Sequence, residues 1–362
     1  MKILVSVFNN LGTDQRVEKV CQTLSENGYE IELLGNNWAG LPPLERNYPF
    51  SRIILKSKIL RFAYVEFQRK LYQELLKKAD QNTILISNDL DTLLPNYLIS
   101  KKLNIPLVYD SHEIFTEMPA INGRFTQKIW RRLEQWIVPK LKYMMTASES
   151  YADWFHETYR IERPVAVQNF PRKTVNPQDY TESNSKKIIL YQGVINPSRG
   201  LDKMIPAMKF IENAEFWIAG DGPRKEEYFR LTESLGLAHK IKFLGKLPPE
   251  KLRAITPKAD VGLSIEENNG LSYFYSMPNK ISDYIQCRVP VVVSDFPEMR
   301  KVVDVFESGE KIADYSELAD KVNKVLQNGK LFYKDSLNNA ATCLCWEKEE
   351  PKILALFHKI PS

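Results

Sequence analysis

Short apolar runs alternate with longer amphipathic segments along the chain. The first two runs, residues 3–8 and 29–34, flank a segment with apolar residues at helical spacing, namely Val17, Val20, Cys21 and Leu24. Gly28 follows this segment, at the place where a glycine commonly ends a helix. The pattern predicts a strand–helix–strand unit, which is typical of a parallel, doubly wound sheet.

Two further apolar runs in the first half, residues 84–87 and 105–109, are each followed directly by polar residues. Open α/β sheets bind ligands at the carboxyl ends of their strands, so Asp110 and His112 are candidate site residues. His112 has an ordinary pKa near neutral pH and suits proton transfer or a hydrogen bond to a hydroxyl group. A structural histidine that caps a loop is the alternative.

The α/β alternation restarts in the second half of the chain. A polar stretch, residues 172–187, precedes a new apolar run at 188–192. Such a stretch is typical of a linker, and a chain of 362 residues has room for two domains of ordinary size. We therefore predict domains over residues 1–168 and 169–340, followed by a terminal segment, 341–362, that contains a helix.

The most informative stretch is residues 273–295. Pro278 suits the first turn of a helix, where its missing N–H is not needed. The free N–H groups of that turn, the helix dipole and Lys280 favour an anion, and Asp283 lies one turn further on. The apolar run 289–293 then predicts a strand buried on both faces. An ordinary crossover helix with a surface Lys and Asp is the alternative.

The loop after the first run contains Gly12 but lacks the Gly-x-Gly-x-x-Gly motif of dinucleotide-binding folds. This weighs against an NAD enzyme. Arg16, which follows the loop, can either reach a phosphate or lie as a solvated charge on its helix.

Two glycine-containing loops follow the first two apolar runs of the second half. Gly193 opens a loop that leads to Arg199, whose guanidinium can bind phosphate oxygens in a bidentate manner. Gly220-Asp-Gly222-Pro closes the next run, and the missing side chains would let a ligand approach the backbone there. A plain turn from strand to helix explains the second motif equally well.

These motifs resemble the donor-site sequence of GT-B glycosyltransferases, in particular the retaining family 4. The match is most specific where Pro-Asn-Lys-x-x-Asp-Tyr is followed by Pro-Val-Val-Val-Ser-Asp, within residues 278–295. The resemblance implies a nucleotide-sugar donor whose diphosphate contacts Lys280 and Arg199 and whose ribose contacts Asp283. Three positions depart from the family pattern: Arg288 replaces a glycine, Val194 an arginine and Tyr275 a glutamate.

The resemblance covers nearly the whole chain and implies the GT-B fold: two Rossmann-like, doubly wound domains that face a cleft, with the terminal helix crossing back to the first domain. It implies donor contacts at Gly12, Gly193, Gly220, Gly222, Leu247, Asn279 and Asp283. It implies catalytic positions at Arg199, Lys280, His112 and Asp110. Family 4 further implies retention at the anomeric carbon, charge stabilisation of the leaving diphosphate, and neither a cofactor nor a metal.

The implied function is the transfer of a sugar to a hydroxyl acceptor, either a saccharide or a lipid-linked saccharide, in the assembly of bacterial cell-surface polysaccharide or glycolipid. Two alternatives share the same sequence features. A GT-B nucleotide-sugar epimerase or hydrolase uses the same donor site, and a non-catalytic membrane-surface protein retains the fold without turnover.

The amino-acid composition limits the possible binding partners and the cellular location of the protein. The net charge of +5 is too small to indicate a nucleic-acid partner. Four cysteines in this chain favour a reducing cytoplasm, and Cys343-x-Cys345 lacks the second pair that a zinc site needs. The N-terminus turns polar too early for a signal peptide, and no apolar run reaches the roughly 18 residues of a membrane span. We therefore expect a soluble, cytoplasmic protein.

Two segments, residues 56–78 and 124–143, combine Lys and Arg with aromatic residues. An amphipathic helix of this kind can lie in the interface of an anionic membrane. That interpretation suits a lipid-linked acceptor and would place the protein on the inner face of the cell membrane. The alternative is that the aromatic residues form the buried faces of helices that cover the sheet.

Overall fold

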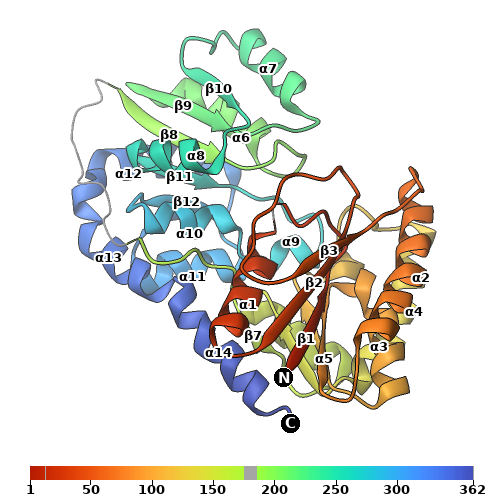
Figure 1. Cartoon of the computed structure of the whole chain (residues 1–362). Coiled ribbons are helices and arrows are strands. Elements are labelled where there is room, and N and C mark those ends of the chain that lie inside the picture. Colours follow the sequence, from red (N-terminus) through yellow and green to blue (C-terminus); the bar gives the residue numbers. More distant parts are fainter. Residues whose placement is uncertain (13, 175–185, 362) are drawn as a thin grey trace. The chain divides into compact units, whose positions relative to one another are not determined.

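The computed structural model describes residues 1–12, 14–174 and 186–361 (Figure 1). The chain divides into two compact units. The first unit comprises Met1–Asn169 together with Glu349–Ser362, and the second unit comprises Phe170–Lys348. None of the helices in the described part of the chain combines the length and the apolar character that crossing a bilayer requires.

The first unit contains a seven-stranded sheet with the strand order β3-β2-β1-β4-β5-β6-β7. Every neighbouring pair is parallel. The order grows outward in both directions from β1 and β4, which is the doubly wound arrangement that the sequence predicts. The strands are β1 (Lys2–Ser6), β2 (Glu30–Asn36), β3 (Phe50–Ile53), β4 (Thr83–Asn88), β5 (Leu107–Ser111), β6 (Tyr143–Thr146) and β7 (Val165–Ala166).

The helices of the first unit connect and cover these strands. They are α1 (Gln15–Glu26), α2 (Leu60–Lys78), α3 (Leu90–Leu103), α4 (Phe125–Ile137), α5 (Glu149–Tyr159) and the greater part of α14 (Trp346–His358). The terminal helix α14 packs on this unit: Thr23 donates to Glu350 over 3.1 Å, and the rings of Tyr29 and Phe357 lie 5.8 Å apart.

The second unit repeats the arrangement with six parallel strands in the order β10-β9-β8-β11-β12-β13. The strands are β8 (Lys187–Gln192), β9 (Ala214–Ala219), β10 (Ile241–Gly245), β11 (Val261–Ser264), β12 (Val291–Ser294) and β13 (Gly309–Ile312). The helices are α6 (Leu201–Ala207), α7 (Lys225–Ser234), α8 (Pro249–Ile255), α9 (Leu271–Phe274), α10 (Asn279–Gln286), α11 (Pro297–Phe306), α12 (Leu318–Phe332) and α13 (Lys334–Cys343). The predicted fold class, two Rossmann-like parallel-sheet domains, is confirmed.

Helix α10 is fixed to the second sheet through Tyr284. The side chain is fully buried, and its hydroxyl donates to the backbone oxygen of Leu190 over 3.0 Å. Gly262 in β11 makes this possible, because a Cβ there would lie 2.4 Å from the Tyr284 ring. The apolar run after the helix forms β12, which is buried along its whole length as the sequence predicts. The position of α10 is therefore set by close packing.

Arg288 stands at the end of α10, where the resembling family has a glycine. Its φ of 56° explains that preference, because the left-handed region favours glycine. The arginine offsets the backbone cost with hydrogen bonds from its guanidinium to Asn338 (2.9 Å) and to the Gln286 carbonyl (2.8 Å). The departure from the pattern thus keeps the backbone conformation.

Some strands differ in extent from those that the sequence predicts. The run at 105–109 predicts that Asp110 follows a strand, whereas β5 extends through Ser111 and includes Asp110. The edge strands β3 and β7 have only four and two residues and left no clear apolar pattern in the sequence.

Candidate functional site

A buried carboxylate joins the two cations that the sequence singles out in the second unit. Glu266, which is 1% exposed, accepts from Arg199 Nη1 through Oε2 and from Lys280 Nζ through Oε1, both over 2.7 Å. We refer to Arg199, Glu266 and Lys280 as the Glu266 cluster. The sequence places Glu266 in a loop after a strand but gave no reason to assign it to the site.

Aromatic rings hold both cations from another side. The Arg199 guanidinium lies 4.8 Å from the centroid of the Tyr273 ring, and Lys280 Nζ lies 4.6 Å from that of Tyr191. A cation is attracted to the face of an aromatic ring. The two side chains therefore have little freedom to move away from Glu266.

The Glu266 cluster lies at the point where the strand order of the second sheet reverses. Arg199 belongs to the loop after β8, Glu266 to the loop after β11, and Lys280 to the first turn of α10. Strands β8 and β11 are neighbours whose connections leave in opposite directions. Open α/β sheets bind ligands at this place, because the diverging loops leave a crevice.

The charges of the Glu266 cluster shift one another's pKa values. Burial works to raise the pKa of Glu266, but the positive charges of Lys280 and Arg199 outweigh it and lower the pKa. The pKa of Lys280 is lowered by burial and by the neighbouring Arg199, and Glu266 opposes both effects. With one carboxylate for two cations, the cluster retains a net positive charge.

Asp283 lies one turn beyond Lys280 on α10 and is half-buried. Its Oδ2 accepts from the side-chain amide of Gln192 over 3.1 Å. Asn279 is the first residue of the helix, which begins one residue after Pro278. The structure thus brings Lys280, Asp283 and Asn279 together at one helix end.

Gly220 and Gly222 of the second unit lie where two of its loops approach each other closely. A Cβ at Gly220 would lie 1.8 Å from the Gly193 carbonyl oxygen, and one at Gly222 would lie 2.4 Å from that of Ile195. Gly220 and Gly222 therefore let two loops of the protein pack together, and their role in donor binding stays a prediction. Gly193 has a φ of 142°, and a Cβ there would lie 3.7 Å from Lys280 Cε.

The two remaining donor-contact predictions are Leu247 and Gly12. Leu247 is half-buried and packs against the apolar core of the second unit. Gly12 belongs to the first unit, where a Cβ would lie 2.6 Å from Pro42 Cγ. A role for both positions in donor binding stays a prediction.

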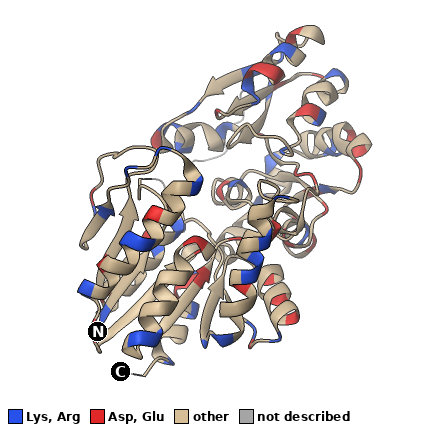
Figure 2. Cartoon of the chain, turned by 90° about the vertical axis from the view of Figure 1, so that its right-hand side faces the viewer, with Lys and Arg blue, Asp and Glu red and all other residues tan. Residues whose placement is uncertain are grey.

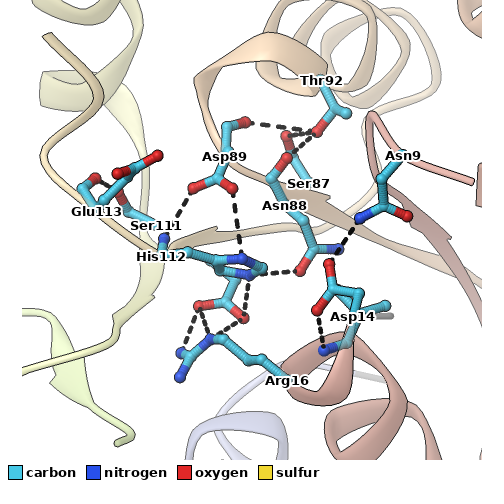
Figure 3. A network of polar contacts seen from close by, with 12 residues as sticks. Asn9, Asp14, Arg16, Ser87, Asn88, Asp89, Thr92, Ser111, His112 and Glu113 are labelled. Atoms are coloured by element: carbon cyan, nitrogen blue, oxygen red, sulfur yellow. Dashed lines mark hydrogen bonds and ion pairs between the residues drawn. The ribbon is translucent and has the colours of Figure 1, made fainter. Parts of the chain in front are cut away.

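A second charged network lies at the corresponding edge of the first sheet (Figure 3). Asp110, which is fully buried, accepts from Arg16 Nη2 over 2.6 Å and lies 3.4 Å from His112 Nε2. His112 Nδ1 lies 3.3 Å from Asp89 Oδ2, and its backbone N–H donates to Asp89 Oδ1 over 2.8 Å. Figure 3 shows the imidazole of His112 next to the carboxylate of Asp89, with Asn88 beside it.

The structure contradicts both roles predicted for Arg16, that of a phosphate ligand and that of a solvated charge on its helix. The side chain is 3% exposed, and it also donates to the backbone oxygen of Val167. It is therefore neither solvated nor free to bind a phosphate. Arg16 instead holds Asp110 in place, a role that the sequence could not reveal because the two residues are 94 positions apart.

The network keeps His112 charged. Burial alone would lower its pKa, but the carboxylates of Asp89 and Asp110 raise the pKa of His112 to about 9. For Asp110, burial works to raise the pKa, while Arg16 and His112 bring it down to about 2. The imidazole is consequently a cation at neutral pH, which differs from the near-neutral titration that the sequence alone suggested.

Asp89 adopts an unusual backbone conformation, with φ 57° and ψ 169°. This region favours glycine, and other residues occupy it mainly where the surrounding structure requires it, often at functional sites. Here the conformation directs the carboxylate at the backbone and the ring of His112. The carboxyl end of β4 is thus strained around this histidine.

Comparison with known proteins matches both units to glycosyltransferases. The family model Glycosyltransferase Family 4 matches residues 12–169, and the model Glycosyl transferases group 1 matches residues 172–341. A chitobiosyldiphosphodolichol beta-mannosyltransferase from Candida glabrata is 22% identical over 390 residues, which is 92% of this chain and 85% of that protein.

Solved structures share the fold over the whole length. A sucrose-phosphate synthase from Thermosynechococcus elongatus superposes with a TM-score of 0.79 at 14% identity, covering 99% of this chain and 98% of that one. Anabaena HepE in complex with UDP and glucose gives a TM-score of 0.74 at 15% identity, covering 99% and 100%. These two structures support the fold alone.

We predict that His112 makes stability depend on pH. Its pKa of about 9 in the folded state exceeds the ordinary value near 6.5, so its stabilisation is complete below about pH 6.5 and is lost as the pH rises through 9. The melting temperature of the wild type should therefore decrease between pH 6.5 and 9.5, and His112→Gln should remove the part of this decrease that is due to His112. The exposed His239 provides the control, and His239→Gln should keep the wild-type profile. Identical profiles for all three proteins would contradict the assignment.

Proposed function

The chain belongs to the group 1 glycosyltransferases and has the GT-B fold, and on this premise we propose that it transfers a sugar from a nucleotide-diphosphate sugar to a hydroxyl acceptor. The observation that carries the proposal is the convergence of Arg199 and Lys280 at the strand-order reversal of the second sheet. We assign this place to the diphosphate of the donor. Following family 4, we propose retention at the anomeric carbon.

The proposed diphosphate site keeps unused hydrogen-bond donors. Lys280 has three N–H donors and Arg199 has five, and each gives one to Glu266 in the described bonds. The remaining N–H groups can stabilise the charge that develops on the leaving diphosphate. The N-terminus of α10, which begins at Asn279, adds the partial positive charge of the helix dipole.

The ribose of the donor suits Asp283. A carboxylate offers only acceptors, which match the two vicinal hydroxyls of a ribose. Since Lys280 and Asp283 lie one turn apart on the same helix, a diphosphate at the first and a ribose at the second are compatible with one ligand. We propose the loop at Gly193, which borders Lys280, as a further wall of this site.

On the acceptor side, we propose that Asp89 and His112 lie beside the acceptor. Both ring nitrogens of His112 face carboxylates, Nδ1 that of Asp89 over 3.3 Å and Nε2 that of Asp110 over 3.4 Å. The imidazolium therefore positions Asp89, whose oxygens can accept from an acceptor hydroxyl, and it cannot itself take a proton. In a retaining reaction on the donor face, the leaving phosphate can take the proton of the acceptor hydroxyl, so a separate base is not required. Asp110 and Arg16 act through His112 and are positioning residues.

Inversion at the anomeric carbon is the second candidate mechanism. The relative from Candida glabrata is named a beta-mannosyltransferase, and a β-linked product formed from an α-linked donor requires inversion at the anomeric carbon. The anomeric configuration of the product, determined by NMR, separates the two mechanisms.

The proposal is tested first by thermal shift with nucleoside diphosphates and nucleotide sugars, and then by turnover with saccharide and lipid-linked acceptors. Transfer that requires both substrates supports it. Product formation from the donor without an acceptor would identify an epimerase or a hydrolase. Binding without turnover on any acceptor would support a non-catalytic protein.

A lipid-linked acceptor is favoured by one surface of the first unit. Large apolar side chains are exposed at the start of α2 and along α4; they are Ile59, Leu60, Phe62, Val65, Phe125, Ile129 and Trp136. Tyr64 of α2 and Trp130 of α4 are in ring contact, with centroids 5.7 Å apart, so the two helices are neighbours. We call this the α2–α4 surface.

Exposed cations accompany the apolar residues of the α2–α4 surface: Lys58, Arg61, Arg124, Lys128 and Arg132. Figure 2 shows Lys and Arg on the helices at the side of the chain where α2 and α4 lie in Figure 1. The sequence left open whether the aromatic residues of α4 are buried or exposed, and both occur: Trp130 packs against Phe115, whereas Phe125 is 75% exposed. Apolar and basic residues together suit an anionic membrane surface.

Lys280→Ala is predicted to weaken the binding of UDP or GDP while the fold is kept. Loss of a charged hydrogen bond to phosphate should cost about 1.5–3 kcal/mol of binding free energy, measured by calorimetry. Lys251→Ala, which changes an exposed lysine of α8, serves as the control and should bind as the wild type does. Unchanged affinity in Lys280→Ala would place the diphosphate elsewhere.

Attachment to anionic vesicles is predicted to depend on the α2–α4 surface. Lys128→Glu with Arg132→Glu should reduce co-sedimentation, because each cation near such a surface contributes about 1 kcal/mol, and Phe125→Ser with Ile129→Ser should reduce it independently of salt. Arg131 is left intact because it pairs with Glu117 over 2.6 Å. Lys251→Glu with Arg253→Glu on α8 is the matched control. If the wild-type protein does not sediment with these vesicles, the proposed attachment to a membrane is wrong.

A further inference from the structure

We propose that Glu266 is a positioning residue of the donor site, which fixes Arg199 and Lys280 so that their remaining N–H groups meet the diphosphate. The inference rests on the proposed function, since it takes the Glu266 cluster as the diphosphate site. Glu266 lies outside the sequence motifs of the donor site, and the inference is that it nevertheless changes the affinity for the donor.

The backbone of Glu266 is anchored on both sides. Its N–H donates to Ser294 Oγ over 2.8 Å, and its carbonyl oxygen accepts from Ser294 Oγ over 2.8 Å and from the Tyr315 hydroxyl over 3.1 Å. Its Oε1 also accepts from Ser264 Oγ over 3.3 Å. A carboxylate held in this way cannot swing out to make room for a phosphate, so it must share the two cations with the ligand.

Arg199 and Lys280 can each bind Glu266 and a diphosphate at the same time. Glu266 contacts one nitrogen of each cation, and the rings of Tyr273 and Tyr191 restrict the remaining orientations. Arg199 is 25% exposed, so part of its guanidinium can be reached from solvent. A rigid anion on one side therefore directs the free N–H groups to the other side.

Glu266 also maintains the charge of Lys280. Lys280 is 9% exposed, and burial together with the neighbouring Arg199 lowers its pKa, whereas Glu266 raises it. Removing the negative charge would leave two like charges in a buried place, where the cheapest response is loss of the lysine proton. Diphosphate binding would then lose one of its two cations as the pH rises.

A passive counter-ion would have the opposite effect. If Glu266 only neutralised charge, its removal would raise the net positive charge of the site and tighten the binding of an anion near neutral pH. If it positions and charges Lys280, its removal weakens binding and adds a dependence on pH. The sign of the change in affinity separates the two roles.

The test measures the Kd of UDP and GDP by calorimetry between pH 6 and 9.5 for wild type, Glu266→Gln, Glu266→Asp and Glu267→Gln. We expect Glu266→Gln to bind about tenfold or more weakly at pH 7.5, as the loss of a charged hydrogen bond implies, and to lose further affinity at higher pH. Glu266→Asp keeps the charge and should restore the pH profile of the wild type. Glu267→Gln changes the neighbouring carboxylate and should match the wild type.

Several outcomes would overturn the inference. Unchanged or tighter binding by Glu266→Gln, or a pH profile equal to that of the wild type, does so. If Glu266→Gln does not fold, Tyr315→Phe removes one anchor of the Glu266 backbone, and unchanged affinity in that variant overturns the inference as well. A wild-type protein that binds no nucleoside diphosphate refutes the proposed function itself, whereas normal binding by both wild type and Glu266→Gln refutes only the role of Glu266.

Discussion

The reversal of strand order between two neighbouring parallel strands organises both units. In each sheet the connections leave the central pair in opposite directions, at β1 and β4 in the first unit and at β8 and β11 in the second. Loops that diverge there cannot cover the strand ends with apolar side chains, so buried polar groups must satisfy one another. Each unit meets this constraint with a buried carboxylate between two cations: Asp110 with Arg16 and His112, and Glu266 with Arg199 and Lys280.

Local packing then sets how accurately these groups are placed. Lys280 belongs to α10, whose position is fixed by Tyr284 lying over Gly262. Gly220 and Gly222 let two loops of the second unit approach to backbone contact. Side chains carried by elements of this rigidity lose little conformational freedom when a ligand binds, which is the basis of preorganised charge stabilisation.

The fold was predictable because it depends on local patterns. Apolar runs and helical spacing report strands and helices directly, and their alternation predicts a parallel sheet. Very short edge strands such as β7 gave too few residues for a pattern. The site was predictable only in part: Arg199 and Lys280 lie in recognisable motifs, but contacts between distant residues, such as Arg16 with Asp110 and Arg199 with Glu266, have no signature in a single sequence. The pKa of His112 was out of reach for the same reason, since it is set by Asp89 and Asp110.

The charge balance of the two networks distinguishes what each can bind. In the first unit two carboxylates, Asp89 and Asp110, are paired with the cations Arg16 and His112. In the second unit Glu266 alone faces Arg199 and Lys280. Burying an unbalanced charge costs free energy, and a bound anion offsets part of this cost. A ligand that binds only the folded state stabilises it in proportion to the logarithm of its concentration, so an anion should stabilise the second unit directly. The net positive charge of the Glu266 cluster therefore supports the proposal of a diphosphate beside it.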